Sequence, residues 1–161
     1  MSDSSFKYSI LASGSTGNSF YVETPKKRFL IDAGLTGKKI TSLLAEIDRK
    51  PEDLDAIFIT HEHSDHIKGV GVLARRYHLD IYANEKTWET IDSRQMIGKL
   101  DNVQKHVFER GKLMTFGDID IESFGVSHDA VDPQFYRLMK DDKSFVLLTD
   151  TGYVSDRMAG M

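Results

Sequence analysis

The sequence predicts an α/β sandwich, in which hairpin strands and helices share one core. Two features support this prediction: short apolar segments separated by tight turns occur in both halves of the chain, and a strand–loop–helix unit lies in the middle. This mixture is not typical of a purely parallel sheet. At 161 residues the chain has room for one core, so we expect a single domain over residues 1–161.

Three short strands are expected first, at residues 8–12, 20–23 and 28–31. Each is mostly apolar. Residues rich in turn formers separate them, with Ser13-Gly14-Ser15-Thr16-Gly17-Asn18 in the first gap and Pro25-Lys26-Lys27 in the second.

A helix is expected after Thr36, because the threonine side chain can accept a hydrogen bond from the first turn. Its apolar side chains fall at i, i+3, i+4 and i+7, namely Ile40, Leu43, Leu44 and Ile47. Pro51 ends that region. Residues 56–59 form a continuous apolar run, which suits a strand that is covered on both faces. A helix over residues 67–77 is expected to follow the polar loop after this strand.

The second half of the chain predicts more strands and another helix. A strand at 80–83 precedes Asn84, which can cap a helix that continues through Trp88, Ile91 and Met96. The later strands are expected at residues 103–108, 113–116, 119–124, 134–139 and 145–149, the last two as a hairpin around Asp141-Asp142-Lys143. Ser155 or Asp156 would cap a further helix, but only residues 157–161 remain, which is too short for a stable helix. We therefore expect the domain to be truncated at its C-terminal end.

The bulk composition excludes several classes of protein. The net charge of −4 gives no overall positive field, so a nucleic-acid substrate would have to meet a local patch. The absence of cysteine excludes disulfides, a cysteine-liganded zinc site and a thiol nucleophile. The polar segment 1–5 does not resemble a signal peptide, and no apolar run is long enough to cross a bilayer. We expect a cytoplasmic protein with no membrane partner.

Four residues of metal-ligating types lie within six positions: His61, His63, Asp65 and His66. They follow an apolar strand and precede a helix, so rigid elements hold their loop on both sides, as a catalytic site requires. His61 and His63 project to the same side of an extended segment and can bind a first metal through imidazole nitrogens. Asp65 and His66 can bind a second metal where the chain turns into the helix. His78 and His106 fall outside this pattern and are expected to be structural.

The segment Thr60-His61-Glu62-His63-Ser64-Asp65-His66 resembles the signature motif of the metallo-β-lactamase fold superfamily of metal-dependent hydrolases. This resemblance implies an αββα sandwich, of which the chain would hold the N-terminal portion, and a site for two metals. Asp32 resembles the family's buried aspartate that supports the ligand loop. His128 resembles the third ligand of the first metal, and Asp150 resembles the carboxylate that bridges both metals.

Two further segments, Leu11-Ala12-Ser13-Gly14-Ser15-Thr16-Gly17-Asn18-Ser19 and Ser127-His128-Asp129-Ala130-Val131-Asp132-Pro133, resemble a small bacterial subfamily. Its members are usually encoded beside the essential two-component regulator of cell-wall metabolism, and a 5′→3′ DNA exonuclease activity has been proposed for some. The resemblance therefore implies single- or double-stranded DNA ends as the partner. The glycine loop is open to two interpretations: a turn between strands, or a cradle in which Gly14, Gly17 and Asn18 contact phosphate.

One feature departs from the family pattern, which ends in a further histidine that completes the second metal site. No histidine follows His128 in this sequence. Either the chain is an N-terminal fragment or the second site is incomplete. If the chain is a fragment, the second half of the sandwich is missing as well, and the apolar strand at 145–148 would lack its cover.

The chemistry that follows from this reading is hydrolysis by a metal-activated hydroxide. Asp65 would ligate the second metal and orient the hydroxide, and Asp150 would bridge the two ions, so both are the candidate catalytic residues. Imidazole and carboxylate ligands without sulfur suit zinc, manganese or iron. A DNA exonuclease, a small-molecule ester, thioester or lactone hydrolase, and a non-catalytic metal-binding or signalling module all remain open. The candidate phosphate contacts are the basic runs Lys26-Lys27-Arg28, Lys38-Lys39 and Arg75-Arg76. The oligomeric state is left open.

Overall fold

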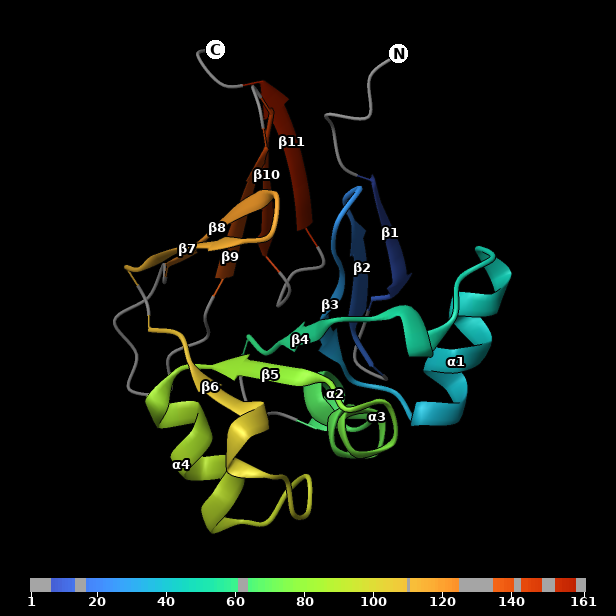
Figure 1. The fold of residues 1–161 in the computed structure, drawn as a ribbon, viewed down its shortest axis with the longest axis vertical. Coiled ribbons are helices and arrows are strands. Elements are labelled where there is room, and N and C mark those ends of the chain that lie inside the picture. Colours follow the sequence, from blue (N-terminus) through green and yellow to red (C-terminus); the bar gives the residue numbers. More distant parts are fainter. Residues whose placement is uncertain are drawn as a thin grey trace.

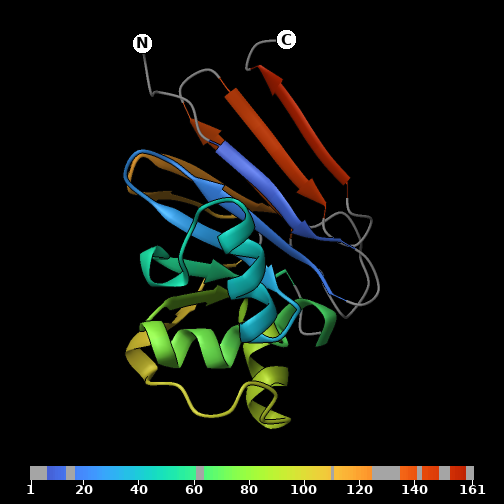
Figure 2. The same cartoon turned by 90° about the vertical axis from the view of Figure 1, so that its right-hand side faces the viewer.

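The computed structural model describes residues 7–13, 17–60, 64–109, 111–124, 135–140, 143–148 and 153–158, of which 64, 65, 135, 143–148 and 153–158 are described by their backbone. Two sheets stack face to face, and the helices α1, α3 and α4 cover the outer face of the first (Figures 1 and 2). These three layers confirm the predicted α/β sandwich.

The first sheet, sheet A, has the strand order β1-β2-β3-β4-β5-β6. Strands β1 to β3 form antiparallel hairpins, whereas β3 to β6 run parallel to one another. Their bounds are Lys7–Ala12, Ser19–Glu23, Arg28–Ala33, Ala56–Phe58, Asp80–Ala83 and Lys105–Val107.

The second sheet, sheet B, has the order β11-β10-β9-β8-β7, and all its neighbours are antiparallel. Its strands are Leu113–Phe116 (β7), Ile119–Phe124 (β8), Phe135–Lys140 (β9), Lys143–Leu148 (β10) and Tyr153–Met158 (β11). The expected hairpin of the last part of the chain is therefore present as β9 and β10.

Apolar side chains form one core on each face of sheet A. Ile40, Leu73 and Trp88 pack from the helices against the outer face, whereas the inner face meets sheet B through aromatic rings. There the Phe58 ring makes edge contacts with Phe29 and Tyr136, at centroid distances of 5.2 and 5.6 Å. Strand β4 is thus buried on both faces, as its continuous apolar run predicts.

The helical segments are α1 (Gly37–Glu46), α2 (Ser64–Ile67), α3 (Val70–Tyr77) and α4 (Glu85–Ser93), with short 3-10 turns at Pro51–Asp53 and Asn102–Gln104. Both predicted caps are confirmed: the Thr36 side chain accepts from Lys39 N, and the Asn84 side chain from Thr87 N. Helix α4 ends before Met96, and the expected strand at 103–108 is shortened to β6 by the second 3-10 turn. No helix in the described part of the chain is long and apolar enough to cross a membrane.

The helix expected over residues 67–77 is divided into α2 and α3 at Gly69. Its backbone N–H donates to Ala33 O at 2.7 Å, outside any helical pattern. A Cβ at this position would lie 2.3 Å from Leu35 O, so only glycine allows the two backbones to approach so closely. The division therefore draws α2 against the end of β3.

The prediction that Ser155 or Asp156 caps the start of a helix is wrong. This segment is strand β11, in which Ser155 lies opposite Val146 and Asp156 opposite Phe145 of β10. A capping residue is a weak local preference, and ladder hydrogen bonds to the edge of an existing sheet override it. The side chains of β10 lie outside the described residues, so their expected exposure remains a prediction.

Candidate metal centre

The candidate site lies at the carboxyl ends of β3 and β4. These strands are parallel neighbours, with Ile31 opposite Phe58, so the residues that follow them meet at one edge of sheet A. Asp32 comes from the end of β3, and Thr60 lies two residues after the end of β4. Helix α2 packs against β3 and carries His66 to the same edge (Figure 1).

Asp32 is a fully buried carboxylate with donors on both oxygens. Oδ1 accepts from Thr60 N at 2.8 Å, and Oδ2 accepts from Thr60 Oγ1 at 2.7 Å. Its backbone has a φ of +64°, a left-handed conformation that costs about 1–3 kcal/mol in a residue other than glycine. Ser19 Oγ supports this turn by donating to Asp32 O at 2.8 Å. The local cost is tolerated because these bonds fix the carboxylate in place.

The His66 ring is buried and is held on both of its nitrogens. Nδ1 lies 2.5 Å from Asp32 Oδ2, and because a carboxylate only accepts, Nδ1 carries the proton and donates. In the neutral ring Nε2 then carries the lone pair, and it lies 3.4 Å from the Asn18 amide nitrogen. A carboxylate that fixes one ring nitrogen and leaves the other for a metal is the common arrangement around metal-binding histidines. The His66 ring and its surroundings fit a metal ligand.

The remaining predicted ligands are not tested by the structure. His61, His63, His128, Asp150 and Gly14 lie outside the described residues, and only the backbone of Asp65 is described, in α2. Within the described ranges, no three histidine, aspartate or glutamate side chains group as a metal site. The structure therefore brings together Asp32, His66 and Asn18, and the convergence of the others stays a prediction.

Two residues of this network were not singled out by the sequence: Thr60 and Ser19. Thr60 is buried and contacts both Asp32 and, at 3.3 Å, His66 Nδ1. The signal was a hydroxyl residue at the end of an apolar strand. It becomes informative only once β3 and β4 are known to be neighbours.

Gly17 serves close packing in this structure. A Cβ on Gly17 would lie 2.4 Å from Leu35 Cδ2 and 2.9 Å from Gly34 O. The next residue, Asn18, accepts a hydrogen bond from Gly34 N at 2.8 Å through its carbonyl oxygen. The glycine loop is thus fastened to the turn after β3, which sets the Asn18 amide beside His66. A phosphate contact from Gly17 or Asn18 remains a proposal.

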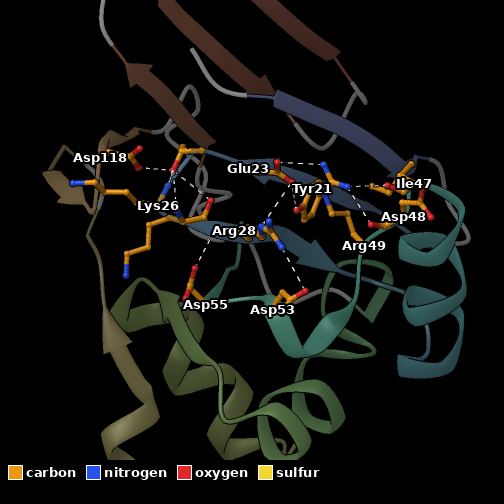
Figure 3. Close-up of polar contacts among 12 residues, drawn as sticks. Tyr21, Glu23, Lys26, Arg28, Ile47, Asp48, Arg49, Asp53, Asp55 and Asp118 are labelled. Atoms are coloured by element: carbon orange, nitrogen blue, oxygen red, sulfur yellow. Dashed lines mark hydrogen bonds and ion pairs between the residues drawn. The ribbon is translucent and has the colours of Figure 1, made fainter. Parts of the chain in front are cut away.

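Three of the seven basic residues suggested as phosphate contacts have other partners in the fold. Lys27 lies over the Phe116 ring at 4.8 Å, and Arg75 Nη1 donates to Ile97 O at 2.6 Å. Arg28 is paired with Glu23 at 3.8 Å and with Asp53 at 3.4 Å (Figure 3). Lys38, Lys39 and Arg76 are exposed and form no ion pair within the described part of the chain.

A second carboxylate, Glu23, organises the polar cluster in Figure 3. Arg49 Nε donates to its Oε1 at 2.5 Å, and Tyr21 donates to the same oxygen at 2.7 Å. Burial alone would raise the pKa of Glu23, but the hydrogen bonds from Arg49 and Tyr21 and the nearby positive charges lower it below its usual value. Burial and the Glu23 charge raise the pKa of the Tyr21 phenol. All these groups are engaged with one another, which is typical of a structural cluster.

The chain belongs to the metallo-beta-lactamase superfamily, whose sequence profile matches residues 12–158. It is similar to the exodeoxyribonuclease WalJ of Streptococcus pneumoniae, at 78% identity over 100% of this chain and 60% of that protein. It is also similar to the exodeoxyribonuclease YycJ of Bacillus anthracis, at 53% identity over 96% of this chain and 58% of that protein. The resemblance to this family is therefore confirmed, and the chain spans about 60% of the length of these relatives.

Solved structures agree on the fold. The metallo-beta-lactamase fold protein YhfI from Bacillus subtilis matches with a TM-score of 0.70 at 18% identity, over 89% of this chain and 62% of that one. At this identity the likeness concerns the fold alone. It confirms the fold class that the histidine motif implied.

Proposed function

We propose that the protein is a metal-dependent phosphodiesterase that degrades DNA from its ends in the 5′→3′ direction. The observation that carries the proposal is the His66 ring, because buried Asp32 holds its Nδ1 and directs the Nε2 lone pair to the site. DNA is proposed as the substrate because two relatives at 78% and 53% identity are named exodeoxyribonucleases.

Six residues would hold two divalent ions: His61, His63 and His128 the first, and Asp65, His66 and Asp150 the second. Such nitrogen and oxygen ligands suit zinc, manganese or iron. When bound, the ions would supply hydroxide near neutral pH and stabilise negative charge on the phosphate oxygens.

The described residues have positioning roles in this scheme. Asp32 keeps the proton of His66 on Nδ1, and Thr60 fixes the carboxylate through its N–H and its hydroxyl. The Asn18 amide, beside Nε2, is a neutral donor that can meet a phosphate oxygen bound next to His66. Asp65 would orient the attacking hydroxide.

The test uses the full-length gene product with strands labelled at the 5′ or the 3′ end. We expect release of nucleotides from the 5′ end, and His63→Ala should abolish both hydrolysis and metal binding. The matched control is His78→Asn, because His78 caps α3 in a left-handed conformation that asparagine tolerates.

Three results would contradict the proposal. Hydrolysis of thioesters or lactones without attack on DNA would make the protein a small-molecule hydrolase. Tight metal binding without any turnover would indicate a non-catalytic module. Equal losses in His63→Ala and His78→Asn would mean that the motif serves folding rather than chemistry.

A further inference from the structure

The outer helical layer carries a positive surface on a chain whose net charge is −4. Its exposed cations are Lys38 and Lys39 of α1, Lys68 just before α3, and Arg75 and Arg76 of α3. The sequence of α3 contains no acidic residue, and the only one in α1 is Glu46 at its end. Helices α1 and α3 lie side by side on sheet A, so these charges share one face (Figures 1 and 2).

Four of these five cations form no ion pair with a carboxylate among the described residues. Arg75 donates to the carbonyl oxygens of Ile97 and Lys99, at 2.6 and 3.2 Å. Lys38, Lys39, Lys68 and Arg76, in contrast, have no carboxylate partner among the described residues. Their mutual repulsion is not offset within this surface, which favours an anionic partner.

The surface is hollowed between the two helices. A groove of about 400 Å³, here called the α1–α3 groove, is lined by Gly37, Lys38, Thr41, Val72, Leu73, Arg76 and Tyr77. Lys38 and Arg76 stand on opposite helices. The Arg76 guanidinium lies 5.7 Å from the centre of the half-buried Tyr77 ring. Cations on two walls together with an aromatic ring in the lining are typical of surfaces that bind single strands.

The α1–α3 groove begins beside the candidate metal centre. Gly69, at the start of α3, donates to Ala33 O, and Ala33 follows Asp32 directly. A Cβ on Gly69 would lie 3.3 Å from Gly37 N, so the first residues of both helices meet the end of β3 here.

We infer that the α1–α3 groove binds the sugar–phosphate backbone of a DNA strand next to the bond that is cleaved, an inference that rests on the proposed function. Lys38 and Arg76 contact successive phosphates from opposite walls, and Tyr77 offers a face to a base. Because backbone contacts carry no sequence information, the groove holds any sequence and contributes affinity rather than selectivity. An anionic membrane would favour a flat surface, whereas this one is concave.

The experiment removes both charges in the full-length protein, as Lys38→Gln/Arg76→Gln. Binding of a fluorescent phosphorothioate single strand, which resists hydrolysis, is measured over a range of salt concentrations. Each phosphate contact to a single strand contributes about 0.7 to the slope of log K against log salt, so the slope should fall by about 1.4. The control Lys86→Gln/Arg94→Gln makes the same charge change on exposed residues at α4 and should leave the slope unchanged. The swap Lys38→Arg/Arg76→Lys keeps both positive charges and should therefore have the wild-type salt slope.

Hydrolysis of bis(p-nitrophenyl) phosphate separates the two proposals, because this small diester cannot reach the groove and the metal centre together. We expect Lys38→Gln/Arg76→Gln to keep this activity while its KM for DNA rises. If the salt slope is unchanged and the small diester is still hydrolysed, the inference that the groove binds DNA is wrong, but the proposed phosphodiesterase activity is not contradicted. A lowered slope in a protein that hydrolyses no phosphodiester refutes the proposed function instead. Loss of binding to vesicles containing phosphatidylglycerol, with DNA binding intact, would assign the groove to a membrane and overturn the inference.

Discussion

Two carboxylates at opposite ends of the β2–β3 hairpin organise polar clusters of different character. Asp32 sits at the end of β3, is fully buried, and receives its hydrogen bonds from Thr60 and His66. Glu23 ends β2, is partly exposed, and is surrounded by Arg28, Arg49 and the Tyr21 hydroxyl. In the second cluster opposite charges satisfy one another. In the first, the carboxylate fixes a ring whose other nitrogen is presented to the site, and this difference separates a functional network from a structural one.

The largest effect is expected from removal of the Asp32 carboxylate. Asp32→Ala leaves the Thr60 hydroxyl and the His66 Nδ1 proton buried without an acceptor and places alanine in a left-handed conformation. We expect the free energy of unfolding to fall by about 3–5 kcal/mol, as when one partner of a buried pair is removed. Urea unfolding of the full-length protein measures this. A loss below about 1 kcal/mol would mean that Asp32 contributes no more to stability than a surface ion pair does, and would contradict its role as a buried anchor.

A smaller effect is expected at Glu23. Glu23→Gln keeps the shape of the side chain but removes the charge that Arg49 and Arg28 face, and partial solvent exposure limits the loss to about 1 kcal/mol. Because the folded-state pKa of Glu23 is lowered, its contribution is fully present above the usual glutamate value of 4.5 and disappears as the pH falls through the lowered pKa. Unfolding of wild type and Glu23→Gln should therefore differ at pH 7 and converge in acid. A difference that persists unchanged in acid would contradict the role of the charge.

The parts of the fold that depend on neighbouring residues could be predicted from the sequence. The caps at Thr36 and Asn84 and the apolar strand β4 are of this kind. The break at Gly69 and the strand β11 could not, because each depends on a distant partner, Leu35 in one case and β10 in the other. A helical period and a capping residue carry no information about such partners.

The residues of the candidate site also fall into those that the sequence predicted and those that it missed. The histidine motif was found from its residue types and spacing, and Asp32 through a family resemblance; the contact of Asp32 with His66 agrees with a supporting role. Thr60 was missed, because its importance comes from the parallel pairing of β3 with β4. The basic runs did not show which cations are available to a ligand. The structure shows that Lys27, Arg28 and Arg75 have partners in the fold, in contrast to the cations of the α1–α3 groove.

The central claim is that Asp32 prepares His66 to bind a metal, whereas Glu23 serves only the fold. Calorimetric titration of the full-length protein with zinc or manganese tests it most directly, using Asp32→Asn and Glu23→Gln as a matched pair of charge-removing variants. Asparagine tolerates the left-handed backbone of Asp32 but weakens its hold on the His66 Nδ1 proton. We predict that Asp32→Asn lowers metal affinity by about 10- to 100-fold, as supporting partners of metal ligands do, and that Glu23→Gln binds as the wild type does. Wild-type affinity in Asp32→Asn, or an equal loss in both variants, would contradict the account.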